Sequence, residues 1–409
     1  MTRDMGVLLV MTRAASGHAG PVATWISAAG WAEAARRRFG NSWIRAPEGI
    51  LTPEEARALA TRPSLAPRRR LRHRLPQTAR NAYRDLREIA RARRYRQAAL
   101  NGPWTSVDLA FVWQRHDIFQ WAGFEAARKM GVPLVLFMDT LQVWEAEKWG
   151  VRRPGWGRLV ERFGELPQVR AADLLACVSE EVAAEVESRG IPEAKILVTP
   201  CAVDLERFSP DGRSNGVRAR LGLHDKFVIG WVGSFRRFHG LDILLDAVAS
   251  VQREVPEAAL LLVGDGLERP RLEQRARDLG LRNVVFVGTV SHSEMPQYIN
   301  AMDVATLLAS GDHEFHYSPL KLREYMACAR PVVAARVGQV GRAVADGKEA
   351  LLVDSIDGNT VATGIRALHD DRGLRNRLGR NARKRAMREA SWDQQLARVS
   401  EALGERIGR

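Results

Sequence analysis

Residues 317–327 have the side chains and spacing best suited to binding a phosphate in this sequence. Ser318 and Pro319 are typical of a helix start, with the serine as N-cap and the proline at the first helical position. The next two backbone N–H groups, of Leu320 and Lys321, are then unpaired at the helix end. These donors, the helix dipole and the Lys321 ammonium converge on one point, which predicts a cradle for a diphosphate.

Glu324 follows Lys321 by three residues, which places both on one face of the predicted helix. A carboxylate there can accept hydrogen bonds from the hydroxyls of a ribose. The alternative interpretation is a capped helix with a Lys–Glu pair on its surface.

A second loop with phosphate chemistry begins with Gly233 and Ser234, after an apolar run. Arg236 and His239 follow, and a guanidinium matches two phosphate oxygens at once. Ligands of doubly wound sheets bind beyond the carboxyl ends of the strands. The loop is therefore predicted to bind an anion, with a solvated loop as the alternative.

Two further glycine loops follow predicted strands. Gly17 and Gly20 precede a proline that can start a helix, so this helix end is open to an anion. Gly264, Asp265 and Gly266 suit the approach of a base or ribose to the backbone. A simple turn explains either loop equally well.

Histidines provide weaker candidates. His116 and Asp139 each follow a predicted strand of the first half and are candidates for orienting a sugar or an acceptor. His316 closes the run Asp-His-Glu-Phe-His at 312–316, which lacks the HExxH spacing of a zinc site, so no metal site is predicted.

Strands and helices alternate along the chain, which is typical of parallel sheets covered on both faces. Two doubly wound units in tandem, divided near residues 204–211, account for the spacing, and residues 392–407 form a final amphipathic helix. The predicted strands span residues 6–11, 109–113, 133–138, 174–178, 196–199, 227–232, 259–263, 284–287, 304–308, 331–334 and 350–353.

The net charge of +14 is concentrated in one segment. Residues 68–96 contain twelve arginines and two acidic residues, a net charge of +10. Residues 78–99 are predicted to form a basic amphipathic helix with Tyr83 and Leu86 on its apolar side. Such a helix can lie on an anionic membrane, although it can also be a solvated surface element. Few aromatic residues interleave the arginines, so no nucleic-acid partner is expected.

The composition excludes several protein classes. Hydrophobic residues at 45% and charged residues at 27% are ordinary for a globular protein. The three cysteines are far apart and odd in number, which argues against a disulfide framework. No apolar run approaches the roughly 18 residues of a membrane span. We expect a cytoplasmic protein that associates peripherally with the inner face of the membrane through its basic segment.

Several motifs together resemble the retaining glycosyltransferases of family 4. They are VGDG at 263–266, FVG at 286–288, MDV at 302–304, GSFRRFHGLD at 233–242, TPCAVDLERFSP at 199–210 and SPLKLREYMACARPVVA at 318–334. The resemblance covers most of the chain and is weak over residues 41–105. It departs from the family at three places. His316 stands where a glutamate is usual, His239 where another basic residue is usual, and Cys201-Ala202 where Asn-Gly usually follows the proline between the domains.

The resemblance implies an α/β protein of the GT-B fold, with two facing Rossmann-like domains. Residues 1–204 would form the acceptor domain, 205–390 the donor domain, and 391–409 a helix that crosses back to the first domain. It implies a UDP- or GDP-sugar as donor, a hydroxyl acceptor, lipid-linked or part of a glycan, and no metal.

Three catalytic residues are expected in the donor half, namely Arg236, Lys321 and Glu324. Two alternatives to sugar transfer are a nucleotide-sugar 2-epimerase of the same fold and a basic nucleic-acid-binding protein.

Overall fold

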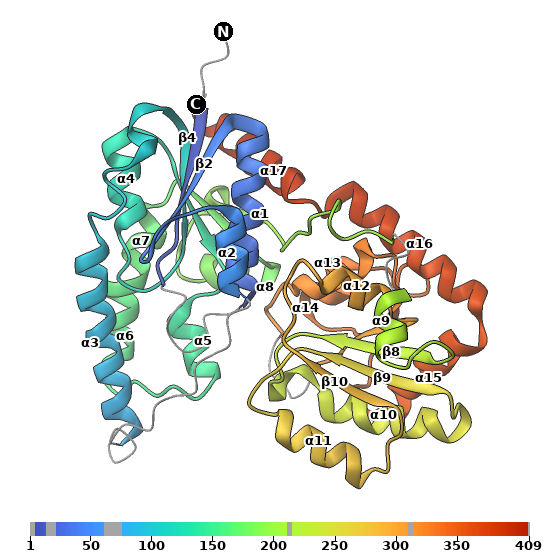
Figure 1. Cartoon of the computed structure of the whole chain (residues 1–409). Coiled ribbons are helices and arrows are strands. Elements are labelled where there is room, and N and C mark those ends of the chain that lie inside the picture. Colours follow the sequence, from blue (N-terminus) through green and yellow to red (C-terminus); the bar gives the residue numbers. More distant parts are fainter. Residues whose placement is uncertain (1–4, 14–21, 61–75, 211–214, 310–314, 408–409) are drawn as a thin grey trace. The chain divides into compact units, whose positions relative to one another are not determined.

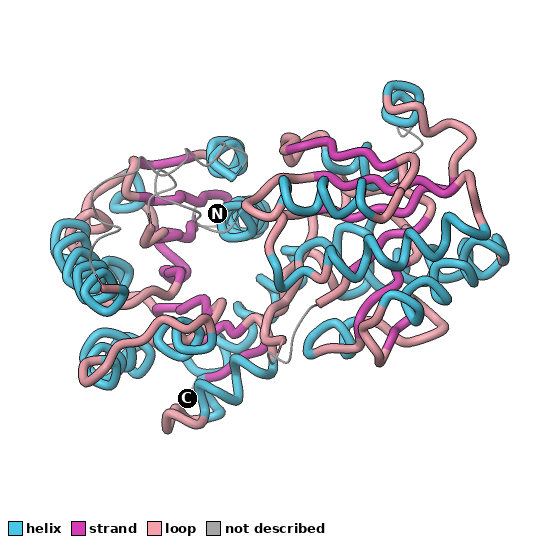
Figure 2. The backbone as a smooth tube through the Cα atoms, turned by 90° about the horizontal axis from the view of Figure 1, so that it is seen from below, coloured by secondary structure: helices cyan, strands magenta, loops and turns pink. Residues whose placement is uncertain are grey.

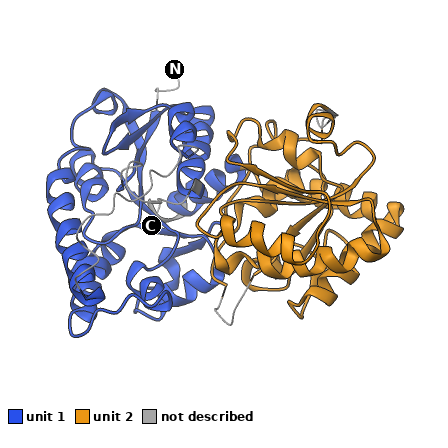
Figure 3. Cartoon of the chain, turned by 60° about the horizontal axis from the view of Figure 1, so that its bottom comes forward, with its two compact units in different colours: residues 1–200, 392–409 blue, residues 201–391 orange. Residues whose placement is uncertain are grey.

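The structure is a computed structural model of the chain, and it describes residues 5–13, 22–60, 76–210, 215–309 and 315–407 (Figure 1). The chain forms two compact units, coloured separately in Figure 3. Unit 1 comprises residues 1–200 and 392–409, and unit 2 comprises residues 201–391. The expected divisions after residues 204 and 390 lie within four residues of these boundaries. Each unit alternates strands with helices, which confirms the expected pair of Rossmann-like domains.

Unit 1 is built on a seven-stranded sheet in the order β3-β2-β1-β4-β5-β6-β7. Its strands are β1 (Met5–Val10), β2 (Gly40–Ala46), β3 (Gly49–Leu51), β4 (Asp108–Arg115), β5 (Leu134–Met138), β6 (Leu174–Cys177) and β7 (Ile196–Val198). All neighbours pair in parallel except β2 and β3, which pair antiparallel. Neither β2 nor β3 is predicted from the sequence.

Helices cover this sheet (Figure 2). They are α1 (Val22–Phe39), α2 (Pro53–Ala60), α3 (Gln77–Tyr95), α4 (Ala122–Met130), α5 (Gln142–Lys148), α6 (Gly157–Val160), α7 (Leu166–Ala171), α8 (Glu180–Glu187) and α17 (Trp392–Ile407). Short 3₁₀ turns lie at η2 (Pro103–Ser106) and η4 (Glu193–Lys195), and one turn of π-helix, η3 (Glu161–Glu165), joins α6 to α7.

Unit 2 is built on a six-stranded parallel sheet in the order β10-β9-β8-β11-β12-β13. The strands are β8 (Phe227–Val232), β9 (Ala258–Val263), β10 (Val284–Gly288), β11 (Val304–Leu307), β12 (Val332–Ala335) and β13 (Leu351–Val353). The helices are α9 (Asn215–Arg220), η5 (Arg237–His239), α10 (Leu241–Glu254), α11 (Arg269–Asp278), α12 (Met295–Asn300), α13 (Leu320–Ala327), α14 (Gly338–Ala343), α15 (Gly358–Asp370) and α16 (Arg372–Glu389).

The apolar strands of unit 2 contribute to two hydrophobic clusters, one on each face of the sheet. Val228 and Val232 of β8 belong to one cluster, and Ile229 and Trp231 of the same strand belong to the other. Successive side chains of a strand point to opposite faces, so a strand that is apolar throughout must be covered on both. This burial explains why the continuous apolar runs in the sequence predict the strands of this unit so closely.

The last helix, α17, belongs to unit 1 and packs on α1. Trp392 at its start lies against Trp31 with ring centroids 5.8 Å apart, and Arg37 forms an ion pair with Asp393 at 2.8 Å. A Cβ atom on Gly30 would collide with the Trp392 indole, so the glycine allows this close contact. The return of the C-terminal helix to the first domain is as expected.

The two ends of unit 2 are bonded to each other. The backbone N–H of Val203 donates to the carbonyl of Ala390 at 2.8 Å, and Val203 also bridges to Ser391. The chain therefore enters and leaves unit 2 through neighbouring segments.

In the part of the chain that the structure describes, no helix has both the length and the apolar character needed to cross a membrane.

Candidate functional site

The order of strands in unit 2 reverses between β8 and β11, because β9 continues from β8 on one side and β11 lies on the other. Doubly wound sheets bind their ligands at such a point, beyond the carboxyl ends of the strands. The loop after β8 holds Gly233, Ser234, Arg236 and His239, and the segment that follows β11 leads into α13. The topology therefore brings both predicted phosphate-binding segments to one place.

Lys321, in the first turn of α13, lies at the centre of this place. Its Nζ lies 4.0 Å from the ring centroid of Trp231. The same Nζ lies so close to Gly233 that a Cβ atom on this glycine would be only 2.8 Å from the nitrogen. Loss of solvent around the ammonium lowers the pKa of Lys321 to about 7, and Glu324 counteracts this in part. Among the described residues no carboxylate forms an ion pair with Lys321. An anionic ligand would supply the missing charge.

The glycines of the β8 and β9 loops are needed for packing between these two loops. Gly233 and Gly264 have backbone φ angles of 137° and 133°, which residues other than glycine rarely adopt. A Cβ atom on Gly264 would overlap the carbonyl oxygen of Gly233, and one on Gly266 would lie 2.5 Å from that of Phe235. Asp265 is exposed, and its carboxylate accepts the N–H of Gly266 at 2.7 Å.

Arg236 and Arg237 are both exposed cations of the β8 loop. Arg237 pairs with Glu268 at 3.5 Å, whereas Arg236 forms no ion pair within the described ranges. Burial, followed by the charges of Lys321 and Arg236, lowers the pKa of His239 to about 2. The imidazole of His239 is therefore neutral at physiological pH and does not add to the positive charge. Ser234 is partly buried beside Gly233.

A row of aromatic rings connects the β8 loop with the segment before α13. The ring centroids of His316 and Tyr317 are 4.1 Å apart. Tyr317 stacks on Phe238 with a centroid distance of 5.8 Å, and the centroids of Phe238 and His239 are 4.3 Å apart. His316 is buried. The row holds the predicted residues His239 and His316 in one local cluster.

Glu324 is buried on α13, and its Oε1 lies 3.1 Å from Nε2 of His292. His292 follows β10, whose carboxyl end lies at the same edge of the sheet. The alternative interpretation, a Lys–Glu pair on the helix surface, is therefore wrong, since Glu324 is buried and bonds a histidine of another segment.

The predicted helix start is wrong in one respect. The N-cap of α13 is Pro319, which uses no side chain for capping, and the helix begins at Leu320. The hydroxyl of Ser318 instead accepts the backbone N–H of Cys201 at 2.9 Å. Because the cap is not provided by a side chain, the N–H groups of the first turn receive no bond from Ser318.

In unit 1 the strand order reverses between β1 and β4. Three consecutive residues at the end of β4 each pair with an opposite partner. Arg115 donates to Asp139 at 2.7 Å, His116 bonds Glu165 at 2.8 Å, and Asp117 accepts from Arg13, which follows β1. The candidates His116 and Asp139 are therefore both engaged in buried or half-buried pairs.

Glu165, at the end of the π-helical turn, is fully buried and bonds three groups. Its Oε1 accepts the N–H of Gln142 at 2.5 Å as well as contacting His116, and its Oε2 accepts the N–H of Val143 at 3.1 Å. It thereby caps α5. Nδ1 of His116 has no hydrogen-bond partner, so it is the nitrogen with which His116 can bond a ligand.

Two further candidates, Gly17 and Gly20, lie within residues 14–21, which the structure leaves undescribed. Residues 312–314 of the run that ends at His316 are likewise outside the described ranges.

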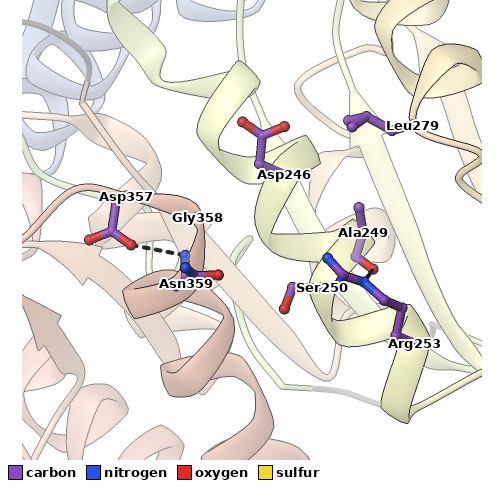
Figure 4. A pocket seen from close by; sticks show the side chains of 8 residues that line it. All are labelled: Asp246, Ala249, Ser250, Arg253, Leu279, Asp357, Gly358 and Asn359. Carbon is purple, nitrogen blue, oxygen red and sulfur yellow. Dashed lines mark hydrogen bonds between the residues drawn. The ribbon is translucent and has the colours of Figure 1, made fainter.

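A separate hollow of about 310 Å³ lies in unit 2 between α10 and the start of α15 (Figure 4). Both of its carboxylates already have partners, since Asp357 accepts the N–H groups of Asn359 and Thr360, and Asp246 pairs with Arg275. None of the predicted site residues lines it.

Sequence reasoning missed three members of these clusters. Trp231 is part of a strand that reads as uniformly apolar, and Glu165 lies in a helix whose π turn has no sequence signature. His292 offered a signal, because it lies only four residues beyond β10, where ligand-binding loops are expected.

Two family profiles match the sequence. The one described as "Glycosyltransferase Family 4" matches residues 33–207, and the one described as "Glycosyl transferases group 1" matches residues 226–371.

Two curated relatives have related sequences. A "D-inositol 3-phosphate glycosyltransferase" of Acidothermus cellulolyticus is 34% identical over 329 residues, 76% of this chain and 70% of that protein. A "GDP-mannose-dependent alpha-(1-6)-phosphatidylinositol monomannoside mannosyltransferase" of Mycolicibacterium smegmatis is 31% identical over 260 residues, 62% of this chain and 68% of that protein.

Among solved structures, Anabaena HepE in complex with UDP-glucose has a TM-score of 0.67 and 17% identity, covering 98% of this chain and 99% of that one. Sucrose-phosphate synthase of Thermosynechococcus elongatus has a TM-score of 0.68 and 20% identity over the same shares. These likenesses concern the fold, and they agree with the expected GT-B architecture.

Proposed function

Since the chain belongs to the family 4 glycosyltransferases, we propose that unit 2 binds a UDP- or GDP-sugar and that the sugar passes, with retention, to a hydroxyl of an acceptor bound by unit 1. The observation that carries the proposal is the Lys321 ammonium, which is desolvated, lies against Gly233 and has no carboxylate partner among the described residues. The comparisons give no support to the epimerase alternative.

Breaking the bond between sugar and phosphate develops negative charge on the leaving diphosphate. Lys321, Arg236 and the N-terminal turn of α13 are fixed positive groups that can stabilise this charge as it forms. Because retention follows when the acceptor attacks the face from which the diphosphate leaves, the leaving phosphate itself can take the acceptor proton. In this proposal Glu324 binds the ribose, and His239 and His316 line the donor site.

We propose that no metal takes part, because the cations of the protein serve the diphosphate. Transfer should continue in EDTA at the rate measured without it. Loss of activity on chelation, with recovery on adding a divalent ion, would contradict this part of the proposal.

The acceptor is proposed to be anionic or lipid-linked. Both relatives are named for inositol compounds that carry a phosphate. The residues proposed to orient the sugar or the acceptor are His116, through Nδ1, and Asp139.

The outer face of α3 is the proposed membrane contact. Leu86 and Tyr83 are 66% and 51% exposed, whereas the opposite face carries the buried Asn81 and Asp85. Asp85 is fixed there by Arg153 at 2.9 Å. Apolar side chains among exposed arginines match an anionic lipid surface, to which each arginine contributes about 1 kcal/mol.

A vesicle-binding assay tests this contact. Replacing the α3 arginines Arg84, Arg87, Arg91 and Arg94 with Gln should weaken binding to phosphatidylserine-containing vesicles at low salt. The matched control changes the same number of charges on α16, at Arg372, Arg377, Arg380 and Arg388, and should bind as the wild type does. If the wild-type protein does not bind these vesicles at low ionic strength, the proposed membrane contact is contradicted.

The proposed activity is tested with a panel of nucleotide sugars. The true donor should raise the unfolding temperature, since a ligand at 100 times its Kd adds roughly 2.7 kcal/mol of stability. Sugar transfer from that donor to phosphate-bearing inositol acceptors is then measured directly. If no UDP- or GDP-sugar stabilises the protein, the proposed donor class is wrong.

A further inference from the structure

His292 is a buried histidine of unit 2 that the proposed function leaves without a role. Its ring packs against Phe208 with centroids 5.1 Å apart, and only 7% of the residue is exposed. Nε2 lies 3.1 Å from Oε1 of Glu324, and Nδ1 is buried without a hydrogen-bond partner. Among the described residues, Glu324 is therefore the one polar group to which the His292 imidazole is hydrogen-bonded.

The bond leaves one oxygen of Glu324 uncommitted. Oε1 is taken by His292, and within the described ranges no hydrogen bond reaches Oε2. A buried carboxylate that serves the fold normally has both oxygens bonded, as Glu165 has. One oxygen held and the other open is the arrangement expected of a carboxylate that binds a ligand.

We propose that His292 is a positioning residue that holds the Glu324 carboxylate in the orientation that bonds the ribose of the donor. The inference rests on the proposed function, in which Glu324 binds the ribose. A glutamate side chain has three rotatable bonds, and fixing them before the ligand arrives removes an entropic penalty from binding. By donating from Nε2, His292 fixes one oxygen and directs the other to the ribose hydroxyls.

The position of Glu324 on α13 supports this assignment. Lys321 lies one helical turn earlier, close enough for Glu324 to raise its pKa. In a bound nucleoside diphosphate, the ribose is adjacent to the phosphates. A carboxylate one turn beyond the phosphate-binding ammonium is therefore at a suitable distance for the ribose, provided that its orientation is fixed.

The test uses two substitutions that divide the roles of the ring. In His292→Phe the ring that packs on Phe208 is retained and the donor is lost. In His292→Gln a side-chain N–H donor is retained. His369→Phe is the matched control, because His369 also contacts a glutamate, Glu257 at 3.3 Å, and packs on Phe227, but contributes to neither predicted loop.

Calorimetric titration with UDP and GDP, and with their 2′,3′-dideoxy forms, provides the readout. Wild-type protein should bind its preferred ribonucleotide about tenfold more tightly than the dideoxy form. His292→Phe should lose most of this preference by weakening ribonucleotide binding, while the Kd of the dideoxy form stays within twofold. For His292→Gln, the logarithm of the ratio between the dideoxynucleotide Kd and the ribonucleotide Kd should be at least half of the wild-type value. His369→Phe should bind both nucleotides as the wild type does.

The outcomes separate the inference from the function on which it rests. A His292→Phe protein that keeps the full ribose preference overturns the positioning role alone. Equal weakening of both nucleotide forms also overturns it, because that result indicates general damage to the site. If His292→Phe does not fold, His292→Gln and His292→Leu decide the question under the same criteria. Wild-type protein that binds neither UDP nor GDP contradicts the proposed donor class, and the inference with it.

Discussion

Each unit contains a buried pair of a histidine and a glutamate near the carboxyl ends of its strands, and the two pairs differ in how their carboxylates are bonded. Glu165 of unit 1 bonds two backbone N–H groups and His116. Glu324 of unit 2 bonds His292 alone among the described residues. The first carboxylate is saturated by the fold, and the second keeps capacity for a ligand.

The charges around the two pairs differ in the same way. In unit 1, Arg115 and Arg13 are matched by Asp139 and Asp117. In unit 2, Lys321 and Arg236 have no such carboxylates within the described residues. A neutralised cluster is suited to holding side chains in place, whereas an unmatched one is suited to receiving an anion. Unmet bonding capacity, more than residue type, therefore distinguishes a binding carboxylate from a structural one.

The largest expected effect is on stability, from Glu165→Ala. The substitution leaves two backbone N–H groups and His116 without their acceptor, and each buried unpaired group costs about 1–3 kcal/mol. We expect a loss of at least about 3 kcal/mol in the unfolding free energy of unit 1, measured by urea denaturation. Glu324→Ala, with one bond to lose, should cost less than half as much. Equal losses would contradict the difference between the two pairs.

The next effect is on donor affinity, from Glu324→Ala. Loss of a hydrogen bond to a charged group is worth about 1.5–3 kcal/mol, or roughly ten- to a hundredfold in the Kd of the donor. Calorimetry on the folded variant measures it. An unchanged Kd would remove Glu324 from the donor site.

The third effect concerns pH and Lys321. Its pKa of about 7 means that the ammonium loses its proton as the pH rises through this value, and the protonated form is the one that attracts the diphosphate. Donor affinity should therefore fall, by up to about fivefold between pH 7 and pH 8. In Lys321→Arg the charge persists over this range, so the fall should disappear. A wild-type affinity that is constant from pH 6.5 to 8.5 would argue against a role for the Lys321 charge.

The smallest effect is expected from Asp139→Asn. Arg115 is buried, but an asparagine keeps an oxygen that can accept the N–H of Arg115, so we expect this substitution to cost about 1 kcal/mol or less. Thermal unfolding should change little, and the donor Kd should match that of the wild type if Asp139 orients the acceptor. A large drop in donor affinity would show that Asp139 orients the sugar of the donor instead.

The sequence predicts those parts of the fold that depend on local pattern. Strands such as β8 and β9 are apolar throughout because both faces are buried, and their bounds follow from the run of apolar residues. The short antiparallel β3 was missed, because a three-residue strand at a sheet edge has too few residues to show a period.

The candidate site was predictable to the same extent. The sequence places Lys321 and the Gly233 loop beyond the carboxyl ends of strands, and in the structure the two are in contact. The capping role of Ser318 was wrong because its hydroxyl bonds Cys201, which is 117 residues away in sequence. The partners Glu165 and His292 were likewise set by contacts between distant segments, which no local pattern reveals.

The bond between Val203 and Ala390 has a consequence for engineering the chain. Because the first and last residues of unit 2 are neighbours, residues 201–391 have the topology of an inserted domain. Unit 2 should tolerate circular permutation, with a short Gly-Ser linker joining its present ends and new termini placed in the exposed turn between α11 and β10. Unit 1 should likewise tolerate a linker from Pro200 to Trp392 that replaces the whole insert, which would allow each half to be exchanged with that of a relative.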